Sequence, residues 1–266
     1  MITREELLKR KRITNVSFSI SFDPIPRIEK YMYELERRLK KQFPDELVDT
    51  KVPYDFVPDA PRFMLRHARK KRFLEVSLVR ATLKMPIVDD YSRNIQQGLD
   101  FFKSQVKAVF NIIKTTIDPS FHIMGGSFRI EYSTLDIPEI STETFFCERF
   151  LKDNIPPPFK FESKLTYVVD RKYFVNYNLS GFKKIEGQID LKSMTPGKQK
   201  FVRVDLNKSE EFDVVDKGIT VNFDINDRYV LDGLNPTVKE VEPSSSIDDI
   251  FEIAKDKING LEDFLL

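Results

Sequence analysis

One set of residues has the spacing of a metal-dependent nuclease. Asp170 follows one predicted strand, and Asp190-Leu191-Lys192 belongs to the next. In such enzymes the two acids hold Mg²⁺, and the lysine orients water or stabilises charge on phosphorus. The pattern arises easily in a chain that is 32% charged, and Asp170 is typical of a turn. We therefore expect a protein without catalytic activity. A nuclease that uses Asp170, Asp190 and Lys192 is the alternative interpretation.

Three basic clusters could instead contact phosphates, at residues 9–12, 37–41 and 69–72. Lysine and arginine bind a phosphate backbone through charge alone. Proteins that bind single strands usually add exposed aromatic rings, whereas the aromatic residues here fall on alternating, buried positions. The clusters are therefore interpreted first as solvated surface. The candidate residues for binding a partner or a nucleic acid are Arg69, Lys70, Lys71, Arg72, Arg37, Arg38 and Lys41.

Polar side chains also share one face of the predicted second sheet. Thr220, Asn222, Asp224 and Asn226 alternate along one strand, and the neighbouring strands are expected to contribute Asn176, Asn178, Arg203 and Asp205. Such a platform could hold a ligand, but the solvent side of an antiparallel sheet has the same composition.

Other familiar chemistry lacks support in the sequence. Cys147 is the single cysteine, so the chain cannot form an intrachain disulfide or a cysteine-rich zinc site. His67 and His122 lie in predicted strands, where a structural role is expected. The loop after Asp224 has Tyr229 where a calcium loop needs glycine. No glycine-rich phosphate loop is present, so we expect neither a metal nor a cofactor.

The elements that position these residues follow from hydrophobic periodicity. Residues 16–22 alternate apolar and serine, which predicts a strand with one buried face. Residues 92–116 have apolar positions at helical spacing, and this stripe is expected to pack on a core or a partner. With a helix at 27–43 and strands at 63–67, 73–83 and 121–132, the first half has the order β-α-β-β-α-β. That order is typical of a ferredoxin-like arrangement.

The second half is rich in strands. They are predicted at 160–169, 173–179, 187–191, 201–206 and 219–225, and form an antiparallel meander. A helix after Ser246, with Asp249 completing a capping box, is expected to fold back over it. Residues 141–158, which include a short helix at 144–151 and end in Pro156-Pro157-Pro158, form the predicted connection between a half at 1–140 and a half at 159–266. Turns at 69–72 and 170–172 occupy comparable places and hint at a duplication.

The fold class is therefore α+β, with two sheet-and-helix halves of opposite charge. Residues 1–130 have 25 Lys and Arg against 16 Asp and Glu, a formal charge of +9, whereas 131–266 have −8. We expect this division to help the halves dock on each other. The 266 residues contain no apolar run long enough to span a bilayer and no secretory signal, so the expectation is a cytoplasmic protein without membrane contact.

Short motifs along most of the chain resemble one family. They are the segment 16–44 ending in Gln42-Phe43-Pro44, Pro61-Arg62-Phe63, Arg129-Ile130-Glu131-Tyr132 before Pro138, Phe223-Asp224-Ile225-Asn226, and the helix 247–265. Together they resemble a large, sporadically distributed family of uncharacterised prokaryotic proteins. The resemblance implies an accessory system, such as phage defence or a toxin and antitoxin module. It implies no catalytic residues.

The sequence thus predicts a non-enzymatic binding or regulatory subunit. Its partner is expected to be a protein or a second copy of the chain, bound through the apolar stripe of the 92–116 helix or the basic turn at 69–72. A nucleic acid is the alternative ligand, bound by the same turn.

Overall fold

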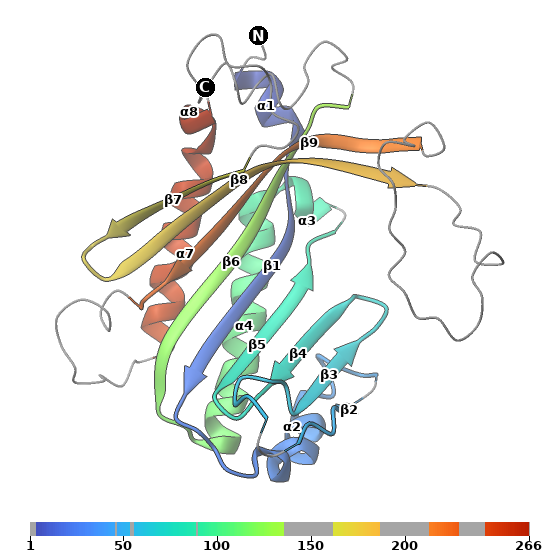
Figure 1. The fold of residues 1–266 in the computed structure, drawn as a ribbon, viewed down its shortest axis with the longest axis vertical. Coiled ribbons are helices and arrows are strands. Elements are labelled where there is room, and N and C mark those ends of the chain that lie inside the picture. The colour runs from blue at the N-terminus through green and yellow to red at the C-terminus, as the bar shows by residue number, and fades with distance from the viewer. Residues whose placement is uncertain are drawn as a thin grey trace.

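The computed structural model describes residues 4–135, 162–186, 213–228 and 243–265, apart from 46, 54, 55 and 89. Figure 1 shows their arrangement. The elements in chain order are α1 Arg4–Arg10, β1 Lys11–Phe22, η1 Ile28–Tyr31, α2 Met32–Leu39, β2 Leu47–Asp49, β3 Phe63–His67, β4 Arg72–Val76, β5 Arg80–Pro86, α3 Asp90–Arg93, α4 Ile95–Ile117, β6 Phe121–Ser133, β7 Glu162–Val169, β8 Tyr173–Glu186, β9 Asp213–Asn226, α7 Pro243–Asn259 and α8 Leu261–Leu265.

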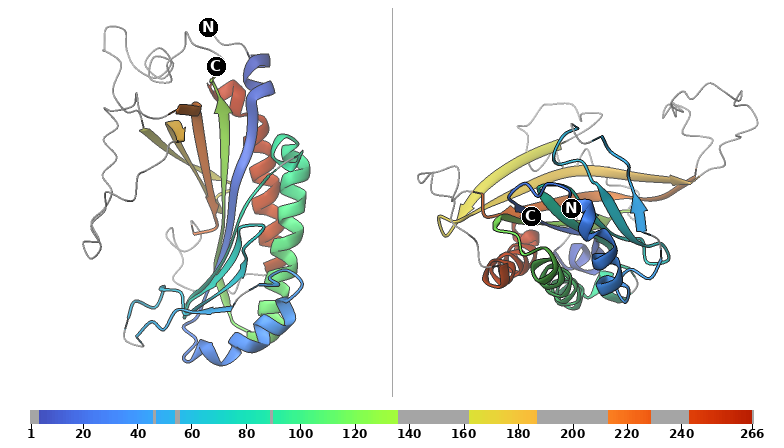
Figure 2. Two further views of the ribbon diagram at one scale, coloured as in Figure 1. Left: turned by 90° about the vertical axis from the view of Figure 1, so that its right-hand side faces the viewer. Right: turned by 90° about the horizontal axis from the view of Figure 1, so that it is seen from below.

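All nine strands form one antiparallel sheet in the order β2-β3-β4-β5-β1-β6-β9-β8-β7. The long helices α4 and α7 lie side by side on one face (Figure 2). The opposite face has no helix on it in the described part of the chain. We call it the open face, and its outward side chains on the middle strands include Glu75, Lys84, Ser17, Ser127, Asp224 and Asn176.

The core lies between the sheet and the helices. Serine and apolar residues alternate along β1, so Val16, Phe18 and Ile20 are buried while the serines face the other way. Phe18, Phe102 and Phe251 bring β1, α4 and α7 into ring contact. The apolar stripe of α4, from Leu99 to Ile113, is buried in this core. The prediction that it could receive a partner is therefore wrong for these residues, because α7 and the sheet already cover it.

The predicted α+β class with an antiparallel sheet is confirmed, whereas the ferredoxin-like order of the first half is not. Residues 73–83 were predicted as one strand, but they divide between β4 and β5. Ser77 makes the turn, since its Oγ accepts the N–H groups of Val79 and Arg80. With β2, which no predicted element covers, the first half has two more strands than predicted. Its β6 pairs with β1 on one side and with β9 on the other, so a single sheet runs through both halves.

The strand order repeats. From the centre outwards, β1-β5-β4-β3 on one side matches β6-β9-β8-β7 on the other, and each meander is followed by a long helix. The hairpin turn between β3 and β4 corresponds to the one between β7 and β8, as the two predicted turns suggested. This repeat divides the chain between α4 and β6, at residues 118–120. The predicted connection at 141–158 lies outside the described residues.

Several local predictions differ from the structure. The helix predicted at 27–43 is a 3-10 turn followed by α2, which ends at Leu39. Gly125 and Gly126, an adjacent pair of glycines typical of a bulge, stay in register with β1. A Cβ on Gly126 would lie 2.8 Å from the Phe128 ring, which explains the glycine by close packing. The helix predicted to start at Ser246 begins at Pro243, so Ser246 and Asp249 do not form its cap. The helix predicted at 144–151 and the strands at 187–191 and 201–206 lie outside the described residues.

Candidate functional site

Rows of small polar side chains cross the centre of the open face. Ser17 of β1 pairs with Lys84 of β5 on one side and with Ser127 of β6 on the other. The row continues through Asp224 to Asn176, and the next row joins Asn15, Arg129, Asn222 and Asn178. The predicted platform on β9 and β8 is thus present in the described part, while Arg203 and Asp205 lie outside it. Because the central residues are short, the face is hollowed there.

This hollow, the central groove, has a volume of about 350 Å³. It is lined by Asn15, Val16, Ser17, Lys71, Phe73, Lys84, Met85, Pro86, Ser127, Arg129 and Asn222. The lining combines three cations, two side-chain amides and one aromatic ring. Lys84 is paired with Glu75 at 2.7 Å and Arg129 with Glu131 at 3.0 Å, so both are held in place. The groove suits a ligand that has negative charge, hydrogen-bonding groups and a flat apolar surface.

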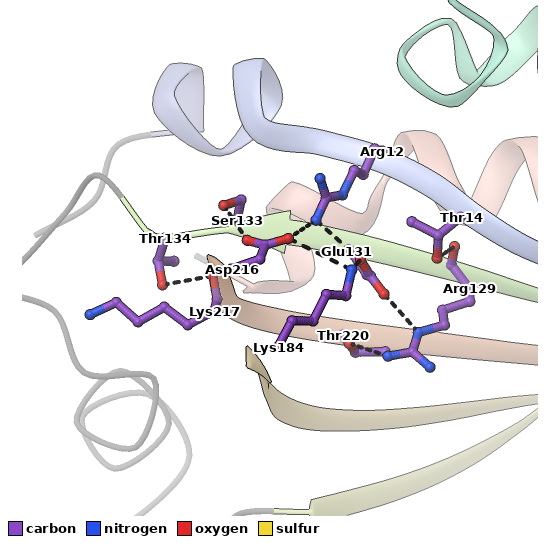
Figure 3. Close-up of polar contacts among 10 residues, drawn as sticks. All are labelled: Arg12, Thr14, Arg129, Glu131, Ser133, Thr134, Lys184, Asp216, Lys217 and Thr220. Carbon is purple, nitrogen blue, oxygen red and sulfur yellow. Dashed lines mark hydrogen bonds and ion pairs between the residues drawn. The ribbon is translucent and has the colours of Figure 1, made fainter. Parts of the chain in front are cut away.

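A charge network around the buried Glu131 carboxylate joins β1, β6, β8 and β9 (Figure 3). The Glu131 carboxylate is 2% exposed and is reached by Lys184 at 2.7 Å, by Arg129 at 3.0 Å and by Arg12 at 3.2 Å. Arg12 also pairs with Asp216. Burial acts to raise the pKa of Asp216, but hydrogen bonds from Ser133 and Arg12 outweigh it and hold that pKa below its usual range.

This network fixes the register of the two halves on each other. Arg12 comes from β1 and Asp216 from β9, which lie on either side of β6. On the helix face, Lys103 and Lys107 of α4 pair with Asp248 of α7. These pairs agree with the expectation that opposite charges help the halves dock.

The three basic clusters have different surroundings. In the first, Lys11 is buried against Glu262 of α8 and Arg12 belongs to the network. In the second, Arg37 binds Glu34 of its own helix, Arg38 donates to Thr115 and Thr116, and Lys41 is exposed. These two clusters are largely satisfied within the protein.

The third cluster is the turn between β3 and β4, which we call the basic tip, Arg69–Arg72. Arg69, Lys70 and Lys71 are exposed, and none of them forms an ion pair with a carboxylate of the described residues. Lys71 has a left-handed backbone, with φ of 49°, and donates its N–H to Ala68 across the turn. The tip therefore presents three charges that the described part of the chain does not neutralise.

Arg72 is the exception within the tip, because it is 5% exposed. Its guanidinium donates to Gln105 Oε1 at 2.8 Å and lies 6.0 Å from the centroid of the Phe101 ring. Burial lowers its pKa, and no carboxylate in the described part of the chain pairs with it. A buried cation without a carboxylate is costly, so this one calls for a functional explanation.

Of the three nuclease candidates, only Asp170 lies within the described residues. Asp170 lies at the β7–β8 turn with a left-handed backbone, and Asp190 and Lys192 lie outside the described residues. Within the described ranges, no three His, Cys, Asp or Glu side chains are grouped to hold a metal ion. His67 contacts Asp45 at 3.2 Å and His122 contacts Asp23 at 2.8 Å.

The comparisons with known proteins add no identity. The chain matches no protein-family model and no curated protein. The resemblance to a prokaryotic family therefore stays a prediction. Among the helices that the structure describes, none is both long and apolar enough to cross a bilayer.

Several groove residues were missed by the sequence analysis, namely Asn15, Phe73, Lys84 and Arg129. A signal was present, because each lies at an outward position of an alternating strand. Which outward positions meet, however, depends on cross-strand register.

Proposed function

We propose that the protein is a non-enzymatic binding protein that holds a single-stranded nucleic acid against the basic tip and the central groove. The observation that supports this most is the contrast between the basic clusters. Most side chains of the first two clusters are satisfied by the protein's own acids, hydroxyls and carbonyls, whereas Arg69, Lys70 and Lys71 have no ion pair within the described residues. Cations held at one edge without internal partners are the usual footprint of phosphate binding.

The groove continues the same surface. Lys71 belongs to the tip and also lines the groove, where Lys84 and Arg129, each paired with a carboxylate, add hydrogen-bond donors toward the centre of the sheet. Asn15 and Asn222 supply amide donors and acceptors, and Phe73 supplies a ring. A single strand exposes base faces and edges that such groups can contact, whereas a duplex hides the faces in its stack. We therefore propose a single strand and not a duplex.

A protein partner with an acidic segment is the other occupant of matching charge. The binding of a second copy of the chain and a regulatory role in a prokaryotic accessory system remain predictions from the sequence. Because the apolar stripe of α4 is buried, the basic tip is the surface through which a protein partner or a second copy would bind.

Binding to labelled 20-nucleotide single strands, at several salt concentrations, tests the proposal. We expect affinity to fall steeply with salt, and the variant R69E/K70E/K71E to lose most of the binding. Each phosphate contact removed should lower the slope of log K against log salt by about 0.7. The matched control is R37E/R38E/K41E, which reverses the same number of charges in the second cluster and should bind nearly as wild type.

Three results would overturn the proposal. They are no binding by the wild type at low salt, equal losses in the tip and control variants, or tighter binding to an acidic peptide than to the strands. Cleavage of the strands with Mg²⁺ or Mn²⁺ would contradict the non-enzymatic part and favour the alternative with Asp170, Asp190 and Lys192.

A further inference from the structure

A second cavity lies on the other side of the basic tip. Its volume is about 310 Å³, at the lower end of the range of small-ligand sites. We call it the Arg72 cavity, and it is lined by Arg69, Lys70, Arg72, Met85, Pro86, Ile87, Val88, Tyr91 and Phe101. Three of these side chains are cations and the other six are apolar or aromatic. The cavity therefore suits a body that is flat or apolar and has acceptor groups.

The cation at its base is already buried. Arg72 points to the helix face of the sheet, since its neighbour Phe73 points to the open face. Its guanidinium is satisfied in part by Gln105 and the Phe101 ring, and its Nε has no hydrogen-bond partner within the described residues. A ligand that fills the cavity removes the remaining water from this cation, and must supply acceptors in return.

One wall of the cavity is an exposed aromatic ring. Tyr91 is 45% exposed and stacks on Phe101, with ring centroids 5.1 Å apart and an interplanar angle of 18°. Gly98 of α4 permits this position, because a Cβ there would lie 2.7 Å from the Tyr91 carbonyl oxygen. Tyr91 lines the cavity and nearly half of its surface is exposed, so a ligand can reach its side chain.

We propose that the Arg72 cavity binds one nucleotide unit, with the base stacked on Tyr91, its polar edge toward Arg72, and its phosphate on Arg69 and Lys70. This inference rests on the proposed function and identifies where a base is held. An aliphatic side chain of a partner protein fits the cavity less well, because it would cover the Arg72 cation without supplying an acceptor. A base has ring nitrogens and, in most cases, carbonyl oxygens at its edge.

The two cavities share a wall, because Met85 and Pro86 line both of them. Lys71 lines the groove, while Arg69, Lys70 and Arg72 line the second cavity. A strand that crosses the tip can therefore place phosphates on its cations and bases on both sides. A free mononucleotide has the same chemistry as one unit of the strand. The experiment must therefore distinguish binding of a free mononucleotide from binding of a strand.

The test combines protein variants with a strand that contains one abasic site. We expect an abasic site to weaken binding by about 5- to 150-fold at one position, which is the effect of losing one base–aromatic stack. Tyr91→Ala should weaken the intact strand by a similar factor and abolish the penalty of that abasic site. Tyr91→Phe keeps the ring and should bind nearly as wild type. Thermal unfolding of each variant checks the fold, and the abasic series in the wild type tests the stack without any substitution.

The outcomes distinguish the inference from the proposed function. Binding that needs the basic tip but is equally strong for Tyr91→Ala and every abasic strand overturns the inference and leaves the proposed function standing. Saturable binding of a nucleoside monophosphate, lost in Arg72→Met, together with no binding of strands, supports the cavity but overturns the proposed function. If neither strands nor the monophosphate bind, both are wrong.

Discussion

Asp227 offers a sharp test of how burial controls charge in this fold. The residue follows β9 and is 4% exposed. Its Oδ1 accepts the Met124 N–H at 2.8 Å, while its Oδ2 is buried with no hydrogen-bond partner in the described residues. Burial raises the pKa of Asp227 to about 6, and the Met124 hydrogen bond and the Lys172 charge oppose that rise only partly.

The direction in which stability changes with pH follows from proton binding. The native state binds more protons than the unfolded state between the unfolded pKa of 3.8 and the folded pKa of about 6. Stability therefore falls as the pH rises through this window, and the full penalty is present by about pH 8. The difference of about 2.2 pH units corresponds to about 3 kcal/mol, of which about 1.4 kcal/mol develops between pH 5 and pH 8.

Asp227→Asn replaces the titrating carboxyl with a neutral amide that can still accept the Met124 N–H. We expect the free energy of unfolding of this variant, relative to wild type, to rise by about 1.4 kcal/mol from pH 5 to pH 8. Urea unfolding at both pH values measures this difference. Asp224→Asn, the same substitution at an exposed position of β9, is the matched control for the change of side chain. A constant difference between wild type and Asp227→Asn across this range would refute the reasoning.

Three further predictions concern stability. Lys11→Met leaves the buried Glu262 carboxylate without its ion pair and should cost about 3–5 kcal/mol in urea unfolding, whereas adding Glu262→Leu should restore much of the loss. Gly218→Ala places a Cβ against a carbonyl oxygen of β6 and should cost about 3 kcal/mol, while Gly260→Ala, where the nearest atom is 3.7 Å away, should cost far less. Arg62→Ala removes three hydrogen bonds to carbonyls of the preceding loop and should speed limited proteolysis there, and unchanged cleavage would contradict that role.

The elements with strong periodicity were predictable from sequence. The serine alternation at 16–22 and the apolar spacing at 92–116 each report a local environment, one buried face of a strand or a helix. Residues 73–83 were predicted as one strand because Leu78 continues the alternation of Leu74 and Val76. Leu78, however, lies in the turn between β4 and β5. Alternation records burial, and a buried turn residue gives the same signal as a strand residue.

The candidate site was harder to predict because it depends on pairing across the sheet. Arg69–Arg72 was a candidate from its charge alone, but the sequence could not separate it from Arg37 and Lys41. Part of the difference lies in the partners that the fold brings near, such as Thr115 and Thr116 of α4 for Arg38. The Arg72 cavity was invisible for the same reason, since its aromatic wall comes from α3 and α4 and its cations from a hairpin.

The repeated strand order has a consequence for how the chain can have evolved. Two units related in this way, with β1 and β6 paired antiparallel at the centre, have the arrangement of a symmetric dimer joined by the residues at 118–120. In a symmetric dimer every substitution appears twice, whereas in a fused pair each unit can change alone. The hairpin turns illustrate that freedom, because one contains four consecutive cations at 69–72 and its counterpart begins with the acid Asp170. Fusion would thus have let one edge of the sheet specialise while the other kept a turn of mixed charge.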